Sequence, residues 1–144
     1  MEIYSGKEYV REGKRSLALS YTLSGELSFN VIDFNAGIDG KDFSSMKEIS
    51  LWIYGNNDRN VYLQVGLSGG ENGYYVSDIG FIDWEGWKKI VLPKKSFYYV
   101  GSFADWEYID TFFIRVNGEI AAREGKVKDE NSGTLYVDDI LRVD

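Results

Sequence analysis

The sequence contains no cysteine and no histidine among its 144 residues, and only one proline. Without histidine, the chain cannot build a Ser-His-Asp or Cys-His catalytic centre. Without either residue, it cannot hold zinc on imidazole and thiolate ligands. The chemistry left open is that of carboxylates, acting as catalytic groups or as ligands of hard cations. The absence of cysteine also removes disulfide bonds as a guide to the cellular compartment.

Long hydrophobic runs and an excess of positive charge are also missing. The formal net charge is −7, so we expect no binding to nucleic acid or to an anionic membrane, because both reward clustered Lys and Arg. No apolar stretch approaches membrane-spanning length, and no signal peptide precedes the first predicted strand. We therefore expect a mature module, or a module excised from a longer protein, in which residues 1–144 form a single domain.

Aromatic residues, in contrast, are abundant. The chain has 4 Trp, 11 Tyr and 8 Phe. A β-sandwich core uses many aromatic side chains, but this excess of tyrosine over phenylalanine indicates rings whose polar edges face water.

Residues 48–68 carry the clearest pattern, in two alternating segments separated by a polar turn at residues 55–60. Alternation with a period of two marks strands that are buried on one face. The faces that we predict to be core are Ile49, Leu51 and Ile53 in the first segment and Val61, Leu63, Val65 and Leu67 in the second. The opposite faces carry Trp52, Tyr54, Tyr62 and Gln64, where an ordinary solvent-facing surface would carry Lys, Glu and Thr.

The rest of the chain indicates an all-β fold. Further strands are predicted at residues 16–23, 26–34, 74–79, 87–92, 109–116 and 134–143. We expect residues 94–108 to form a long aromatic loop and residues 117–132 a charged loop. Because no segment holds a helical apolar period and the short strands are joined by Gly and Asn turns, we predict an antiparallel two-sheet β-sandwich.

Three pieces of sequence carry a resemblance to a known family. They are EGKRSLALSY at residues 12–21, ISLWIYG, VYLQVGL and DWEGWKKIVLP between residues 49 and 93, and SGTLYVDDILRV at residues 132–143. In order and spacing they resemble the jelly-roll carbohydrate-binding modules attached to polysaccharide-degrading enzymes. The resemblance implies a galactose-binding-like jelly roll without catalysis, a glycan in a groove on one sheet, and a structural calcium far from the groove. The chain departs from the family in lacking a clear acidic-aromatic opening strand before Gly13.

The outward strand faces supply the candidate carbohydrate-binding residues, which are Trp52, Tyr62, Gln64, Tyr75, Trp106, Arg115 and Asn117. Trp52 must point away from the core if Leu51 points into it, because a one-residue slip inverts every side chain. A pyranose ring offers an apolar C–H face that stacks on aromatic rings, and hydroxyls that amide and guanidinium groups can bind.

Each candidate has an expected role if these outward faces lie on one sheet. Trp52 and one tyrosine, Tyr62 or Tyr75, would stack on sugar rings. Gln64, Arg115 and Asn117 would bond sugar hydroxyls, and Trp106 would close one end of the groove. Whether the outward faces lie on one sheet is left open, because jelly-roll connections often cross between sheets.

Residues 81–85 carry the alternative of catalysis. Phe81-Ile82-Asp83-Trp84-Glu85 approximates the Glu-x-Asp-x-Glu strand of jelly-roll endoglucanases, in which a spacing of two puts the carboxylates on one strand face. Retaining glycosidases need two carboxyl groups about 5 Å apart. Because Phe81 stands where the nucleophilic Glu should be, we favour an exposed bend and expect no catalysis.

Asp138 and Glu2 are the candidate calcium ligands. The YVDDI segment resembles the strand whose first Asp ligates calcium in related modules, which nominates Asp138 with Glu2 as a second ligand. Backbone carbonyls near Lys14 and Arg15 would complete the oxygen ligands that calcium prefers.

These observations predict a non-catalytic module that binds a plant-type polysaccharide, such as β-glucan, xylan or mannan. We expect it to be secreted or extracellular, within a larger enzyme that carries a covalently linked glycoside hydrolase or polysaccharide lyase domain. The alternative is a protein–protein interaction domain or a structural spacer of a multidomain protein, because an exposed aromatic patch marks protein interfaces equally well.

Overall fold

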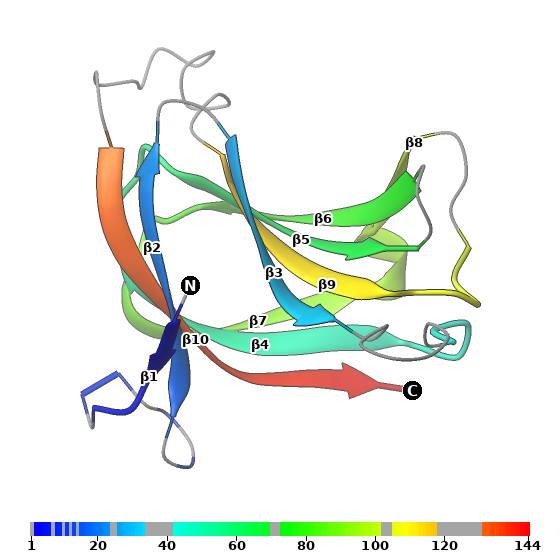
Figure 1. Cartoon of the computed structure of the whole chain (residues 1–144), viewed down its shortest axis with the longest axis horizontal. Helices are drawn as coiled ribbons and strands as arrows, with labels where there is room; N and C mark the ends of the chain where they lie inside the picture. Colours follow the sequence, from blue (N-terminus) through cyan, green and yellow to red (C-terminus); the bar gives the residue numbers. More distant parts are fainter. Residues whose placement is uncertain are drawn as a thin grey trace.

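The computed structural model describes residues 2–6, 8–9, 11, 13, 15–23, 26–33, 42–69, 73–101, 105–117 and 131–144. Within them, antiparallel strands form two five-stranded sheets that face each other (Figure 1). Sheet A has the strand order β1 (Glu2–Tyr4), β2 (Ser16–Leu23), β10 (Asn131–Val143), β4 (Glu48–Asn56) and β7 (Glu85–Pro93). Sheet B has the strand order β3 (Glu26–Asp33), β9 (Thr111–Asn117), β5 (Tyr62–Ser68), β6 (Gly73–Phe81) and β8 (Tyr98–Gly101).

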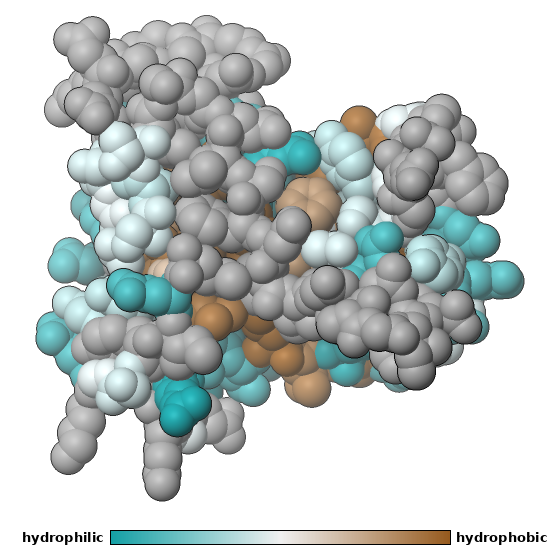
Figure 2. Space-filling model, viewed as in Figure 1, coloured by the Kyte–Doolittle hydropathy of each residue, from teal (hydrophilic) through white to brown (hydrophobic). Residues whose placement is uncertain are grey.

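The prediction of a two-sheet antiparallel β-sandwich is therefore confirmed. The core lies between the sheets and is formed mainly by the aliphatic side chains on the inner faces of the strands. Leu51 and Ile53 of β4 are fully buried, as are Leu63 and Val65 of β5, which confirms the face assignments made from alternation. Figure 2 shows hydrophobic residues in brown near the middle of the molecule and hydrophilic residues in teal mostly toward its outside. No helix in the described part of the chain is long and apolar enough to cross a membrane.

The turn between β4 and β5 changes sheets. β4 pairs with β10 and β7 in sheet A, whereas β5 pairs with β6 and β9 in sheet B. Hydrogen bonds hold this turn: the Asn56 side-chain oxygen accepts from the Asp58 N–H at 3.1 Å, and the Asp58 carboxylate accepts from the Asn60 N–H at 3.3 Å. Such side-chain-to-backbone bonds are typical of Asn and Asp in tight turns. The outward faces of the two alternating segments therefore lie on opposite sides of the molecule.

Two expected loops differ from the structure. Residues 94–108 contain the 3-10 helix η1 (Lys94–Ser96) and the edge strand β8, which pairs with β6. The pattern does not reveal β8, because an edge strand forms through backbone bonds to a neighbour and needs no alternation of its own. Of the predicted charged loop, residues 118–130 lie outside the described residues, and β10 already begins at Asn131, which pairs with Leu23.

Strand β10 contains a bulge where its register with β4 shifts between Asp138 and Leu141. Asp139 has a positive φ of 52° there, a conformation that Asp tolerates better than most residues. The strand continues to Val143, and the Arg142 guanidinium then pairs with the Asp144 carboxylate, with Nε–Oδ1 and Nη2–Oδ2 distances of 2.6 and 2.8 Å.

Candidate functional site

The outer face of sheet B brings four of the predicted residues together. Gln64 of β5 lies beside Arg115 of β9, and Tyr62 lies beside Asn117 on the same pair of strands. The four side chains share a face because Leu63, Val65, Ile114 and Val116, which alternate with them, are buried in the core. We call this surface, which also includes Tyr74, Asp78, Tyr98 and Phe113, the sheet-B face.

A hydrogen-bonded network occupies the β6–β8 side of the sheet-B face. The Gln64 amide nitrogen donates to the Asp78 carboxylate at 2.8 Å and to the Tyr98 hydroxyl at 3.1 Å. The Tyr98 hydroxyl also donates to the same Asp78 oxygen at 3.4 Å. Partial burial, followed by the nearby Asp78 charge, raises the pKa of Tyr98, so its hydroxyl stays protonated at neutral pH. Gln64 is only 6% exposed and Tyr98 is 45% exposed. The network is therefore anchored at the buried Gln64 amide and reaches solvent at the Tyr98 side chain.

A second cluster lies around Arg115. Its guanidinium carbon is 5.0 Å from the centroid of the Tyr74 ring and 5.3 Å from that of the Phe113 ring, and its Nη1 is 3.5 Å from the Tyr74 hydroxyl. Tyr74 and Phe113 meet edge to face at 5.7 Å. These contacts hold the planar guanidinium in place, which lowers the entropy lost when it bonds a ligand.

Gly66 explains how Phe113 can lie across the sheet. The two residues are directly opposite each other on β5 and β9. A Cβ atom at position 66 would collide with the Phe113 ring. Glycine therefore allows the ring to cover this part of the sheet, where Phe113 is only 6% exposed.

The sheet-B face presents complementary groups for a ligand rich in hydroxyls. Arg115 supplies donors and Asp78 supplies an acceptor, while Gln64 and Asn117 are buried amides beside them, 6% and 5% exposed. At one end, the Tyr62 ring meets Phe81 edge to face at 5.1 Å. An elongated ligand would thus meet aromatic rings at Tyr62 and Tyr74 and polar groups between them.

Trp52 does not belong to this face. Its side chain points away from the core, as predicted, but from β4 and therefore from the other sheet. There the Arg11 guanidinium carbon lies 3.4 Å from the centroid of the Trp52 ring, so the N-terminal segment covers it. Because the chain changes sheets between β4 and β5, Trp52 does not lie beside Gln64 and Arg115, as its predicted role required.

Tyr75 and Trp106 are also placed elsewhere. Tyr75 pairs with Leu67, whose side chain is buried, and its ring stacks on Trp106 with centroids 3.8 Å apart and 15° between the planes. Both rings pack against the core, and Trp106 also contacts Phe97 edge to face at 5.9 Å. Since neighbouring strand residues point to opposite sides, the outward tyrosine of this pair is Tyr74.

Tyr74, Asp78, Tyr98 and Phe113 lie on the sheet-B face but are not among the carbohydrate-binding residues predicted from the sequence. Alternation across β6 could have identified Tyr74 and Asp78, because both have the parity opposite to Tyr75. Tyr98 could not be found in this way, because only the pairing of Val76 with Tyr98 brings it beside Gln64.

The carboxylates of the catalytic alternative do not share a strand. Phe81 ends β6 in sheet B, Asp83 lies in the following turn, and Glu85 begins β7 in sheet A. The arrangement that the alternative requires, with all three positions on one strand face, is therefore not formed.

The calcium prediction at Asp138 and Glu2 is not supported by a ligand cluster in the described residues. These residues contain no group of three or more acidic side chains that could hold a metal. The Asp138 carboxylate accepts the Arg11 N–H at 2.9 Å and the Asp139 N–H at 2.8 Å. Glu2 pairs with Ala18 on β2, and Lys14, near which carbonyl ligands were expected, lies outside the described residues. Calcium thus stays a prediction.

The fold is similar to that of solved structures, whereas comparisons at the sequence level find no match. No family model matches the chain, and no curated protein matches it. Among solved structures, it is similar to the family 11 carbohydrate-binding module of the cellulosomal cellulase Lic26A-Cel5E of Clostridium thermocellum, with 18% identity and a TM-score of 0.60 over 99% of this chain and 79% of that one. It is also similar to a family 11 module of the same organism in complex with a β-1,3-1,4-mixed-linked tetrasaccharide, with 19% identity and a TM-score of 0.61 over 99% and 80% of the two chains. At these identities, the likeness demonstrates the fold.

Proposed function

We propose that this protein is a non-catalytic carbohydrate-binding module that holds a neutral plant-type polysaccharide, such as β-glucan, xylan or mannan, along the sheet-B face. The observation that carries the proposal is the paired arrangement of Gln64 with Asp78 and Tyr98, next to Arg115 with Tyr74. Fixed donors and acceptors beside aromatic rings match the alternating hydroxyl edges and C–H faces of a sugar chain.

The overall charge supports a neutral ligand. A net charge of −7 disfavours anionic polysaccharides such as pectin. The similarity to a module solved with a mixed-linkage tetrasaccharide makes β-glucan the first ligand to test. For such a preformed, shallow site, we expect a Kd on the order of 10 to 100 µM, or roughly −5 to −7 kcal/mol.

Affinity electrophoresis and calorimetry test this proposal. We expect retardation in gels that contain mixed-linkage β-glucan, xylan or mannan, and Arg115→Ala should weaken binding about tenfold or more because it removes charge-assisted hydrogen bonds. The matched control is Arg59→Ala, because Arg59 is exposed in the turn between β4 and β5. Normal migration in all of these gels would contradict the proposal and favour the protein-interaction alternative.

We further propose that the module works inside a larger secreted enzyme, linked covalently to a glycoside hydrolase or polysaccharide lyase domain. The support is physical: a tether converts micromolar binding into a high effective concentration of the catalytic domain at its substrate. Fusing the chain to such a domain should raise activity on insoluble substrate, and Arg115→Ala in the fusion should reverse this gain without changing activity on a short soluble substrate. A gain that persists in the variant would contradict the tethering role.

A structural calcium is part of the same proposal, on the strength of the resemblance at Asp138. A ligand that binds only the folded state stabilises it by mass action, so EDTA should lower the Tm if calcium is bound. An unchanged Tm in EDTA, together with no metal in elemental analysis, would remove calcium from the proposal.

A further inference from the structure

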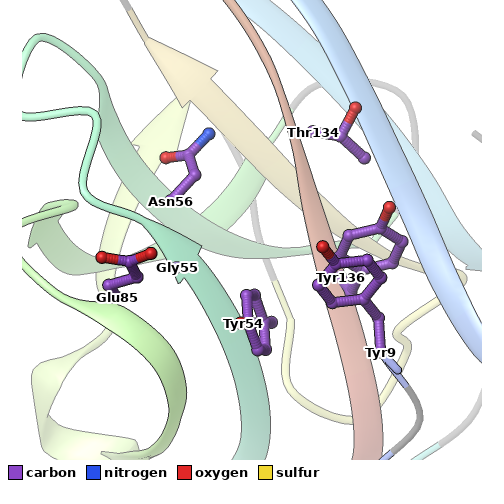
Figure 3. A pocket seen from close by; sticks show the side chains of 7 residues that line it. All are labelled: Tyr9, Tyr54, Gly55, Asn56, Glu85, Thr134 and Tyr136. Atoms are coloured by element: carbon purple, nitrogen blue, oxygen red, sulfur yellow. The ribbon is translucent and has the colours of Figure 1, made fainter. Parts of the chain in front are cut away.

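A pocket of about 280 Å³ opens on the outer face of sheet A. Figure 3 shows the side chains that line it, with Tyr54, Asn56 and Glu85 on one side and Thr134, Tyr136 and Tyr9 on the other. Its floor is formed by the adjacent strands β10, β4 and β7, whose register places Tyr54 between Tyr136 and Trp87. We call it the sheet-A pocket.

Three tyrosine rings form the apolar wall of this pocket. Tyr9 and Tyr136 stack with their centroids 4.1 Å apart and 6° between their planes. Tyr54 stands almost perpendicular to both, at 4.8 Å from Tyr9 and 6.3 Å from Tyr136. Trp87 supports Tyr54 from the other side at 5.5 Å, so Tyr54 is held between aromatic neighbours. The wall is therefore built before a ligand arrives, which lowers the cost of binding.

Polar groups complete the lining beside these rings. Glu85, the first residue of β7, is exposed and pairs across the strands with Asn56. The Asn56 amide is fixed, because its nitrogen donates to the Tyr21 hydroxyl at 3.0 Å and its oxygen accepts from the Asp58 N–H. Thr134 has its hydroxyl 3.1 Å from that of Ser20. The Glu85 carboxylate is thus the charged acceptor that the pocket offers to a ligand.

We propose that the sheet-A pocket is a second sugar-binding site, which takes a single neutral pyranose ring from an oligosaccharide or from the end of a chain. A volume of about 280 Å³ lies just below the usual range for small-molecule sites, about 300 to 1,000 Å³, and therefore suits one ring rather than a polymer segment. The tyrosine wall matches the C–H face of a sugar, while Glu85 and the phenol hydroxyls match its hydroxyl groups. The Glu85 charge disfavours uronic acids.

The sheet-A pocket would take the same class of ligand as the sheet-B face but lies on a different surface. The pocket residues come from β4, β7 and β10 of sheet A, together with Tyr9, whereas the sheet-B face comes from β5, β6, β8 and β9. One module could then contact two glycan chains, one on each side of the sandwich. Two weak sites on one molecule raise the avidity for a dense polysaccharide without any new contact at either site.

Titration of the ¹⁵N-labelled protein with cellobiose, xylobiose, mannobiose and digalacturonate, followed by NMR amide shifts, tests this site. We expect a neutral disaccharide to shift the amides of Tyr54, Asn56, Glu85 and Tyr136 along a curve separate from that of the Gln64 and Arg115 amides. Digalacturonate should leave the pocket amides unchanged. Glu85→Ala should weaken the pocket curve about tenfold and leave the other curve unchanged, because it removes one charge-assisted hydrogen bond.

Three variants separate the possible outcomes. Glu107→Ala is the matched control, because Glu107 is exposed in the turn before β9. Tyr136→Phe, which keeps the ring and removes the hydroxyl, should also weaken binding at the pocket. It provides a second test of the site if Glu85→Ala does not fold. In Arg115→Ala, the pocket curve should persist.

Pocket amides that stay unshifted while the Gln64 and Arg115 amides move would overturn the second site and leave the proposed function intact. Loss of the pocket curve in Arg115→Ala would also overturn it, because the shifts would then report one site. Shifts of the pocket amides alone would support the second site and contradict binding at the sheet-B face. If no sugar shifts either set, both proposals fail.

Discussion

On the outer face of sheet A, the Trp52 ring of β4 lies under Arg11 of the protein's own N-terminal segment, whereas the rings of the sheet-B face lie beside charged and amide groups. The Arg11 guanidinium carbon lies 3.4 Å from the centroid of the Trp52 ring. On the sheet-B face, Arg115 contacts Tyr74, and the exposed Tyr98 is bonded to the buried Gln64. Both surfaces arise from strands that place rings opposite an aliphatic core face.

The difference teaches that an outward aromatic residue is not yet a binding residue. A ring that the chain itself covers contributes to stability through buried area and cation–π contact. A ring beside fixed polar groups can instead contribute to recognition, because the free energy of its burial is released only when a ligand arrives. Substitutions of Trp52 and of the sheet-B residues should therefore separate stability from binding.

The largest effect is expected from Gly66→Ala, which breaks the sheet-B face. Because the new Cβ atom would collide with the Phe113 ring, we expect the free energy of unfolding to fall by about 3 kcal/mol, together with weaker glycan binding. Denaturant unfolding and calorimetry measure the two effects.

The double variant Gly66→Ala with Phe113→Leu is the control for this collision. The shorter side chain makes room for the Cβ atom, so the loss of stability should be clearly less than the sum of the two single losses. Additive losses would show that the Phe113 ring is not what Gly66 accommodates.

Trp52→Ala tests the other face and should lower the free energy of unfolding by about 2 kcal/mol, through lost packing and the lost contact with Arg11. Glycan binding should stay within twofold of the unmodified protein. This reverses the expectation from sequence, in which Trp52 stacks on a sugar ring.

Arg11→Ala completes a double-mutant cycle with Trp52→Ala. The two losses should be less than additive, because each variant removes the same cation–π contact. A tenfold loss of glycan binding in Trp52→Ala, with little change in stability, would instead place the polysaccharide on sheet A.

A finer comparison concerns two neighbouring tyrosines of β8 with nearly equal exposure, Tyr98 at 45% and Tyr99 at 44%. Tyr98→Phe removes the hydroxyl that accepts from Gln64, so we expect a loss of about 1 kcal/mol in stability and binding weakened several-fold. Tyr99→Phe is the matched control and should change neither. Equal effects of the two variants would show that the Gln64 network does not take part in recognition.

The smallest effect is expected away from both faces, at the C-terminal end of β10. The bond to Arg142 lowers the pKa of Asp144, and bonds from Ser44 lower the pKa of Asp42. A carboxyl whose folded pKa is lowered stabilises the fold above its unfolded pKa, and this stability is lost as the pH falls through the folded pKa. We therefore expect the Tm to fall when the pH is lowered below about 4.

Arg142→Gln checks the origin of this acid sensitivity. Thermal melts of the variant between pH 7 and pH 2 should show a weaker pH dependence than those of the unmodified protein, while glycan binding at neutral pH should not change. An identical pH dependence would show that the Arg142–Asp144 pair does not contribute to it.

Much of the architecture could be predicted from the sequence. Alternation identified the core faces at Leu51 and Leu63 correctly, and the turn residues between short strands indicated a two-sheet sandwich. Of the residues predicted for the candidate site, Tyr62, Gln64, Arg115 and Asn117 lie together, but Trp52, Tyr75 and Trp106 do not join them.

The direction of a side chain depends on local sequence, whereas the pairing of strands depends on the whole chain. The side on which a residue leaves a strand depends on the residue before it and the one after it, so residues 48–68 by themselves determined that Trp52 and Gln64 point away from the core. Which strands become neighbours depends on how the whole chain buries its aliphatic faces and satisfies its backbone bonds. Only the tertiary structure therefore decided that Trp52 lies under Arg11 on one sheet, while Gln64 lies beside Arg115 and Tyr98 on the other.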